Sequence, residues 1–395
     1  MNSASLQFSR SAGRKQRFAF DPVVVMTTAA LLLVGLVMVT SASVTVADRQ
    51  SGDPFAYLER QMFSALIGVA AAFVMTKLPV EFWEKNGTAL LLVAFGLLLV
   101  VLVPGIGHAV NGSRRWVRAG PLNFQPSEAA RMLLLTYICG YVVRHQEALR
   151  SSFRGFLRPL AVLGAAAVLL LAEPDFGSAM VLLVAGVGVL FIAGARLRDT
   201  LLLAGAGGAL MALVAVSSEY RVRRLTAFLD PWADPFNSGF QLTQSLIAIG
   251  RGEWLGVGLG SSVQKLFYLP EAHTDFVFAV LAEEFGFIGV LVTVGLFMVL
   301  VLRALRIARL AGEAGMGFHA CMAAAFGIWI GLQAFINVGV NMGLLPTKGL
   351  TLPLLSYGRS SLVVTLAWIG VLLRVHHEVA ASGRVVVAAR GGADT

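Results

Sequence analysis

The chain has 395 residues, of which 57% are hydrophobic and only 13% are charged. Soluble domains carry about 25% charged residues, so this composition excludes an ordinary soluble protein. Lys and Arg number 31 against 22 Asp and Glu, which gives a net charge of +9. Most of the Arg lies in short segments between apolar runs, and no basic patch is interleaved with aromatic residues. The charge therefore indicates membrane topology signals and no nucleic-acid partner.

Apolar runs of about 20 residues, the length that crosses a bilayer, recur along almost the whole chain. We predict an all-α fold, a polytopic transmembrane helix bundle with about ten spans. Residues 1–21 are predicted to form a basic tail, 22–375 the transmembrane domain and 376–395 a second tail. The spans are predicted near 22–46, 60–78, 87–103, 127–144, 157–173, 176–194, 200–218, 275–302, 317–341 and 356–374.

Lys and Arg cluster before the first span and after the fourth, sixth, eighth and tenth spans. Since short cationic loops stay in the cytoplasm, both termini are predicted to be cytoplasmic. The outer side then carries segments 104–126 and 341–357 and a long loop, 219–274, between spans seven and eight. A loop of this length is usually functional. Its Trp, Phe and Leu content predicts short helices against the membrane surface, and its cations, which oppose the topology rule, predict a bound anion.

Four blocks of sequence resemble one known family, the SEDS proteins (shape, elongation, division and sporulation). They are NGSRRWVRAGPLNFQPSEAAR at 111–131, EPDFGSAM at 173–180, the segment 220–289 containing QKLFYLPEAHTDF, and LLPTKGLTLPLLSYGRSS at 344–361. The QKLFYLPEAHTDF wording is closer to the division members than to the elongation members. The family usually reads SYGGSS, so Arg359 either alters the local geometry or adds a cation that faces phosphate.

The resemblance implies ten transmembrane helices and a peptidoglycan glycosyltransferase. Such an enzyme polymerises lipid II into glycan strands during septal cell-wall synthesis and releases undecaprenyl diphosphate, a polyprenyl diphosphate. The implied location is the bacterial inner membrane at the division septum. The implied partners are a class B penicillin-binding protein, which is the septal transpeptidase, and other membrane proteins of the division complex.

The resemblance also implies site residues. Asp275 would be the catalytic base that removes a proton from the acceptor hydroxyl. The pyrophosphate leaves as a stable anion and needs positive charge rather than a second acid. Lys348, in the turn Pro346–Gly349, is favoured for that charge, and a divalent cation, Mg²⁺ or Mn²⁺, is an alternative source. The other substrate-binding candidates are Arg114, Arg115, Arg223, Arg224, Glu128, Gln244, His273 and Ser356, and Glu173 and Asp175 are the candidates to hold a metal.

Each of these residues also has a purely structural explanation. The loop cations, including Lys265, could be solvated, Glu128 could pair with Arg131, and Glu173 and Asp175 could sit in an exposed turn. Thr274 or Asp275 could cap a helix. Glu283 and Glu284 are expected to meet Arg or backbone partners inside the bundle. The run Gly256-Val257-Gly258-Leu259-Gly260 resembles a phosphate loop only superficially, since no strand precedes it.

Two other functions are compatible with a membrane bundle. A flippase would carry lipid II across the bilayer, and a division scaffold would only bind partners. Transport requires polar groups through the whole membrane depth. Here the polar residues cluster on the outer side, which favours the polymerase.

Overall fold

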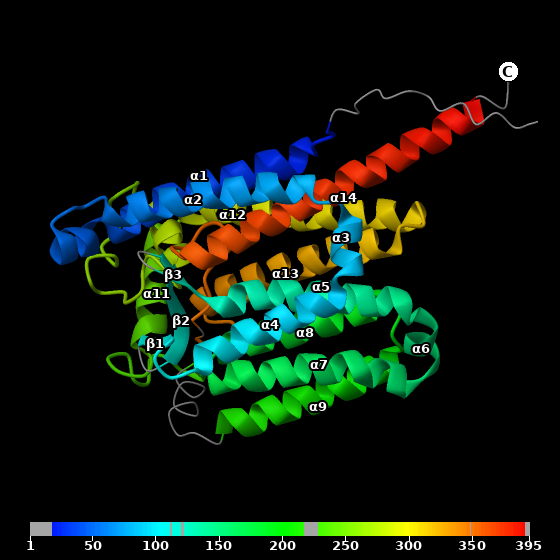
Figure 1. Cartoon of the computed structure of the whole chain (residues 1–395). Coiled ribbons are helices and arrows are strands. Elements are labelled where there is room, and N and C mark those ends of the chain that lie inside the picture. The colour runs from blue at the N-terminus through cyan, green and yellow to red at the C-terminus, as the bar shows by residue number, and fades with distance from the viewer. Residues whose placement is uncertain (1–17, 111–112, 120–121, 217–227, 348, 392–395) are drawn as a thin grey trace, which may run out of the picture.

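A computed structural model describes residues 18–110, 113–119, 122–216, 228–347 and 349–391 of the chain. Most of these residues form long helices that run side by side in a bundle (Figure 1). The long helices are α1 (Pro22–Ser51), α2 (Ala56–Lys77), α4 (Gly87–Leu102), α5 (Pro126–Arg144), α7 (Phe153–Ala172), α8 (Phe176–Ile192), α9 (Leu197–Val216), α12 (Val277–Glu313), α13 (Gly317–Asn341) and α14 (Arg359–Gly391). The short ones are α3 (Val80–Lys85), α6 (Gln146–Ser151) and α11 (Phe240–Gly252).

Six of these helices are long and apolar enough to cross a membrane, namely α1, α2, α7, α12, α13 and the 359–382 part of α14. Helices α4 and α8 are apolar but shorter. Large apolar side chains such as Leu66, Phe73 and Leu92 are exposed on the outside of the bundle. Exposed apolar faces of this size suit lipid rather than water. The helical bundle with membrane-spanning helices is therefore confirmed.

Two predicted spans end too early. Helix α12 continues to Glu313 and α14 to Gly391, whereas the apolar windows stop near residues 302 and 374. The hydropathy window detects only the part of a helix that suits lipid. The continuation of α12, residues 303–313, is rich in Arg, Ala and Leu, which are strong helix formers, so this helix extends past the apolar stretch. The continuation of α14 is rich in Val and has no such explanation.

The all-α prediction is wrong for the segment 104–126, which was expected to be an irregular polar loop. It contains a three-stranded antiparallel sheet of β1 (Gly107–Val110), β2 (Ser113–Ala119) and β3 (Leu122–Phe124) in the order β1-β2-β3. The sequence carried one signal for it. The Asn-Gly pair between β1 and β2 in the sequence is a strong hairpin signal, whereas polar and apolar residues do not alternate regularly in SRRWVRA.

The interior of the bundle is built around α13 and α14. Helix α13 packs against α12, α8 and α5, and α14 packs against α2. Trp329 of α13 stacks on Trp368 of α14 with ring centroids 4.9 Å apart, and both side chains are buried. Large rigid rings at this crossing fix how the two helices meet.

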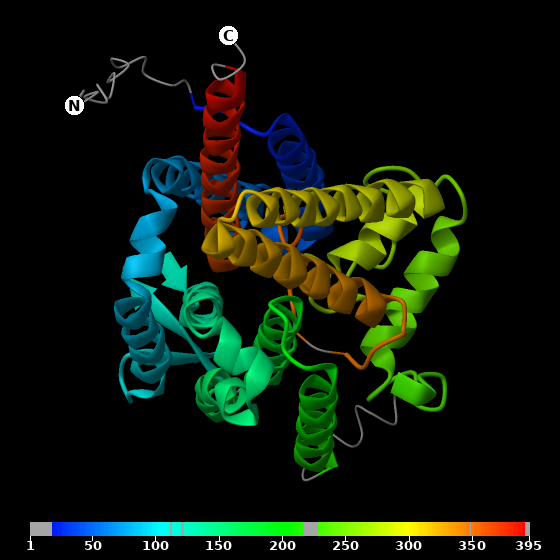
Figure 2. The same ribbon diagram turned by 90° about the vertical axis from the view of Figure 1, so that its right-hand side faces the viewer.

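The two ends of the bundle differ in character. The sheet, α11 and the starts of α12 and α14 lie at one end, on the left of Figure 1. The first turn of α1, the far end of α14 and the short helices α3 and α6 lie at the opposite end, which faces the viewer in Figure 2. The predicted site residues that the structure describes lie at the first end, where the connections are longest.

Candidate active site at the loop-rich end

Asp275 lies half-buried in the turn that leads into α12. Its main-chain carbonyl accepts hydrogen bonds from Nδ2 of Asn337, at 2.9 Å, and from Nδ2 of Asn341, at 3.0 Å. Oδ1 of Asn341 accepts the amide of Ala279 at 3.2 Å, which is the bond that a capping side chain makes. Helix α12 is thus capped at Ala279 from the neighbouring α13, and not by Thr274, whose hydroxyl donates to Glu271.

The carboxylate of Asp275 lies against the turn before α14. A side-chain carbon placed on Gly349 would come within 3.2 Å of Oδ2 of Asp275. Asn337 holds this turn too, because its Nδ2 donates to the carbonyl of Leu350 at 2.6 Å. One asparagine therefore joins the Asp275 turn to the turn that carries Lys348. Lys348 itself lies outside the described residues, as do Arg223 and Arg224.

His273 and the start of the SYGRSS segment hold the two turns together. The amide of Tyr357 donates to the carbonyl of His273 at 2.9 Å. The ring of Tyr57, at the start of α2, packs edge-on against His273 and Tyr357, with centroids 4.7 Å and 4.9 Å away. Burial lowers the pKa of the His273 imidazole, although the nearby Glu271 carboxylate opposes this, so the ring is neutral near pH 7.

Ser356 is a structural residue of the same segment. Its hydroxyl accepts the amide of Leu352 at 2.8 Å, and its carbonyl accepts Nε2 of Gln61 at 3.1 Å. The side chain is buried. These contacts explain on structural grounds why a serine stands here, and its role in substrate binding stays a prediction. Arg359 stands where the family's SYGGSS segment usually has its second glycine. It is the first residue of α14 and is half-buried.

A second group of charges lies at the turn between α7 and α8. Arg115 of β2 donates to the carbonyl of Pro174, and its Nη1 lies 3.9 Å from Oδ1 of Asp175. Asp175 caps α8 by accepting the amide and the hydroxyl of Ser178, at 3.1 Å and 2.8 Å. Arg114, the neighbour of Arg115 on β2, is exposed. Arg115 thus ties the sheet to the helix turn, while Arg114 remains available to an anion.

Glu173 differs from Asp175. It is fully buried, and neither carboxylate oxygen has a hydrogen-bond partner in the described part of the chain. Burial and the negative charge of Asp175 raise its pKa to about 8, with Arg115 acting in the opposite direction. No cluster of three or more acidic, His or Cys side chains gathers anywhere in the described ranges. Mg²⁺ is commonly held by one or two carboxylates and completed by phosphate oxygens, and this pair fits that donor set.

Three other residues that were considered for the site are Glu128, Lys265 and Gln244. Glu128 forms a buried ion pair with Arg131, so the structural explanation is confirmed for it. Lys265, which was considered either an anion-binding or a solvated loop cation, is buried and bonded to Glu284, so neither explanation holds for it. Gln244 lies half-buried on α11, beside Ser245, whose hydroxyl donates to the carbonyl of Asn341 at 2.8 Å.

Sequence reasoning missed Asn337 and Asn341. The signal was available: Gln333, Asn337 and Asn341 recur at four-residue spacing within the apolar run 317–341. Such spacing places three amides on one helix face, and polar groups inside a membrane span are usually functional. The prediction that Glu283 and Glu284 meet Arg or backbone partners is confirmed for Glu283, which meets Arg251 and the amide of Val263. The carboxylate of Glu284 meets Lys265 and Ser41 instead.

Comparison with known proteins shows which family the whole chain resembles. A family model of FtsW, RodA and SpoVE proteins, described as "Cell cycle protein", matches residues 22–381. A protein of Thioalkalivibrio sulfidiphilus named "Probable peptidoglycan glycosyltransferase FtsW" is 53% identical over 97% of this chain and 97% of its own. One of the same name from Nitrosococcus halophilus is 56% identical over 91% of this chain and 93% of its own.

Solved structures show the same fold. A chain from work titled "Structural coordination of polymerization and crosslinking by a peptidoglycan synthase complex" aligns with a TM-score of 0.74 and 31% identity, over 92% of this chain and 99% of that one. The crystal structure of the Thermus thermophilus rod shape determining protein RodA aligns with a TM-score of 0.66 and 29% identity, over 91% and 97%. With the family model matching most of its length, the chain belongs to the FtsW/RodA/SpoVE family.

Proposed function

We infer that this chain is a peptidoglycan glycosyltransferase that polymerises lipid II for septal cell-wall synthesis, with Asp275 as its general base. The names of the curated relatives support the activity. The observation that carries the assignment of the base is the position of Asp275. Its carboxylate is half-buried beside Gly349, while Asn337 and Asn341 fix its main chain. A base must be held in one place to take a proton efficiently.

In the proposed reaction, Asp275 removes the proton from the acceptor sugar hydroxyl as that oxygen attacks the anomeric carbon of the donor. The bond from this carbon to the lipid pyrophosphate breaks, and undecaprenyl diphosphate leaves as an anion. A single displacement inverts the configuration at the anomeric carbon. The positive charge for the leaving group is assigned to Lys348, Arg223 and Arg224, with the exposed Arg114 as a further source. A divalent cation held by Glu173 and Asp175 would supply the same kind of charge.

The proposal includes a topology and a partner. We assign the ten long helices as ten membrane spans, with the loop-rich end outside and both termini in the cytoplasm at the septum. The cationic segments at the other end support this orientation. A class B penicillin-binding protein is the proposed partner, together with other division proteins. The likeness to a chain from a complex that couples polymerisation to crosslinking supports that partner.

Substitution of Asp275 by asparagine tests the base. The change keeps the size of the side chain but removes the basic oxygen, and Asn337 and Asn341 still bind the unchanged carbonyl. We expect glycan synthesis from purified lipid II, with the penicillin-binding partner present, to fall roughly 10²–10⁴-fold. Product length and yield on gels are the measurement.

Asp230→Asn is the matched control, since Asp230 is an exposed acid in the same outer loop. It should polymerise at the wild-type rate. Near wild-type synthesis by Asp275→Asn would remove Asp275 from the role of base. A wild-type protein that moves lipid II across proteoliposomes but makes no polymer would instead identify a flippase.

A further inference from the structure

Helix α12, which begins at Val277, is interrupted at Gly286. Gly286 has φ 62° and ψ −163°, which lie outside helical values. In an unbroken helix the carbonyls of Glu283 and Glu284 would accept the amides of Phe287 and Ile288, each four residues further on. The break separates both pairs, and four main-chain groups need other partners inside the protein.

The outer loop supplies all four partners. Two loop amides bond the freed carbonyls, and two loop carbonyls accept the freed amides. The bonds are Val257 to Glu283 at 2.9 Å, Gly258 to Glu284 at 3.1 Å, Phe287 to Glu253 at 2.9 Å and Ile288 to Trp254 at 3.2 Å. The loop is therefore inserted into the hydrogen-bond ladder of the helix at its break.

The glycine run of this loop serves that insertion. Gly256, Gly258 and Gly260 all have positive φ, at 80°, 99° and 82°, a conformation that other residues rarely adopt. Gly256 also lies so close to the main chain of Glu284 that a side chain there would collide with it. The run that superficially resembled a phosphate loop is thus the part of the loop that enters the break.

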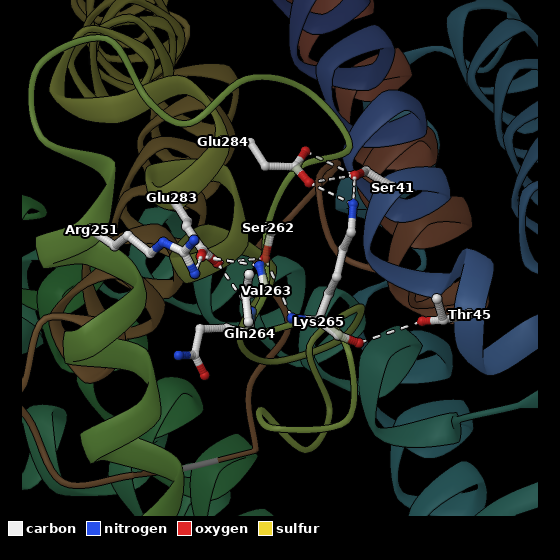
Figure 3. Close-up of polar contacts among 9 residues, drawn as sticks. All are labelled: Ser41, Thr45, Arg251, Ser262, Val263, Gln264, Lys265, Glu283 and Glu284. Carbon is white, nitrogen blue, oxygen red and sulfur yellow. Dashed lines mark hydrogen bonds and ion pairs between the residues drawn. The ribbon is translucent and has the colours of Figure 1, made fainter.

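The side chain of Glu283 binds the next part of the same loop (Figure 3). Its carboxylate accepts the hydroxyl of Ser262 and the amides of Val263, at 3.1 Å, and Gln264, at 3.4 Å. Arg251, at the end of α11, lies 3.6 Å from it and supplies the opposite charge. The carboxylate is fully buried, so these donors replace its hydration.

The side chain of Glu284 points to the other side of the loop (Figure 3). It accepts Nζ of Lys265 at 2.8 Å and the hydroxyl of Ser41 at 2.7 Å, and Lys265 also donates to Ser41 at 2.9 Å. Ser41 belongs to α1, so this tie reaches a third element. Glu284 and Lys265 are only 1% and 4% exposed, which makes the pair a buried one whose halves depend on each other.

We propose that Glu283 and Glu284 are positioning residues for Asp275, an inference that rests on the proposed function. Residues 257–265, which precede Asp275, are bonded to residues 283 and 284, which follow it. The chain thus closes into a ring that contains the Asp275 turn. Asn337 and Asn341 fix this ring from α13, and Ser41 fixes it from α1. Breaking the contacts that close this ring should move the carboxylate of Asp275 without removing it.

The Glu284–Lys265 tie gives the sharpest test, because each partner has a substitute of similar shape. Glu284→Gln and Lys265→Met each remove one charge, and the double variant removes both. Since a misplacement of 1 Å costs about 10²-fold in rate, we expect each single variant to lose roughly 10- to 100-fold in kcat. KM for lipid II should stay within about twofold, because the substrate contacts are intact. The double variant should lose about as much kcat as the single variants, roughly 10- to 100-fold and not the product of their losses, since all three break one tie.

Glu313→Gln is the control. Glu313 lies at the other end of the same helix and forms an ion pair of the same length, 2.8 Å, with Arg309, but both side chains are exposed. It should leave kcat and KM unchanged. If a single variant fails to fold, the double variant still decides the question, because it leaves no unpaired buried charge. A folded double variant with wild-type kcat, or one with raised KM and unchanged kcat, overturns the proposal.

The two inferences fail separately. If Asp275→Asn polymerises normally, the assignment of the base is lost whatever Glu284 does. If Asp275→Asn is inactive while the Glu284 and Lys265 variants turn over at the wild-type rate per folded molecule, Asp275 remains the base and only its positioning by this tie is wrong.

Discussion

The two acids of the α7–α8 turn show how strongly single residues depend on their surroundings. Asp175 is satisfied by Ser178 and lies near Arg115, whereas the buried Glu173 has no partner among the described residues. The pKa of Glu173 is raised from 4.5 to about 8 by burial. Between these pH values the folded protein holds a proton that the unfolded chain has released. Its stability therefore falls as pH rises through this window.

Glu173→Gln should remove this dependence. An amide does not titrate, so the variant should gain thermal stability relative to the wild type as pH rises from 5 to 9, with most of the gain before about pH 8. Unfolding midpoints in detergent at several pH values are the measurement. Glu59→Gln, at an exposed acid on α2, should track the wild type throughout. Parallel curves for Glu173→Gln and wild type would show that Glu173 is charged in the fold.

At the scale of helices and strands, the sequence predicted what composition controls. Long apolar runs identify spans because only hydrophobic helices suit lipid, and the long described helices overlap the predicted runs. The sheet was missed because SRRWVRA has no regular polar and apolar alternation, which left the Asn-Gly pair before it as the signal for a hairpin. The helix ends at Glu313 and Gly391 were missed because polar helical residues resemble loops in a hydropathy window.

The sequence could predict a site residue only where that residue belongs to a motif of the family that the chain resembles. Asp275 came from the resemblance, but its asparagine supports lie 62 and 66 residues away in the sequence. Lys265 was misassigned for the same reason, since its partner Glu284 is brought to it by the fold. Long-range contacts of this kind depend on how helices pack, which local periodicity does not determine.

The prediction at the scale of helices concerns the break of α12 at Gly286. A side chain there would need positive φ and would meet the main chain of Gly256 and Gly252. Gly286→Ala should therefore destabilise the protein, by about 1–3 kcal/mol for the backbone strain alone. Thermal unfolding in detergent checks the direction, and loss of polymerisation should accompany it because the break receives the loop.

Gly295 is the matched control for that substitution. It lies further along α12 and has open space around its missing side chain. Alanine is favoured over glycine in a helix by about 1 kcal/mol, so Gly295→Ala should leave stability unchanged or raise it. Equal effects of the two substitutions would mean that the break at Gly286 is not required by the fold.

At the scale of the whole molecule, charge is divided between the two ends of the bundle. The end opposite the site carries a cationic set on described residues: Arg144, Arg150, Arg154, Arg158, Arg196, Arg198, Arg303, Arg306, Arg309 and Arg374. Short cationic loops stay in the cytoplasm. In the proposed orientation the site opens on the outer face, where a lipid-linked donor in the outer leaflet could reach Asp275 without crossing the bilayer.

This orientation predicts which positions an impermeant reagent reaches. Ser238 is exposed beside α11 at the site end, and Ser151 is exposed at the end of α6 on the opposite side. In a background with Cys139→Ala and Cys321→Ala, which removes both native thiols, a cysteine at 238 should react with an impermeant maleimide in intact spheroplasts. A cysteine at 151 should react only after the membrane is permeabilised. Both positions are exposed, so the difference reports the side of the membrane and not burial. The reverse pattern would place Asp275 in the cytoplasm, where the donor would have to be used before it is flipped.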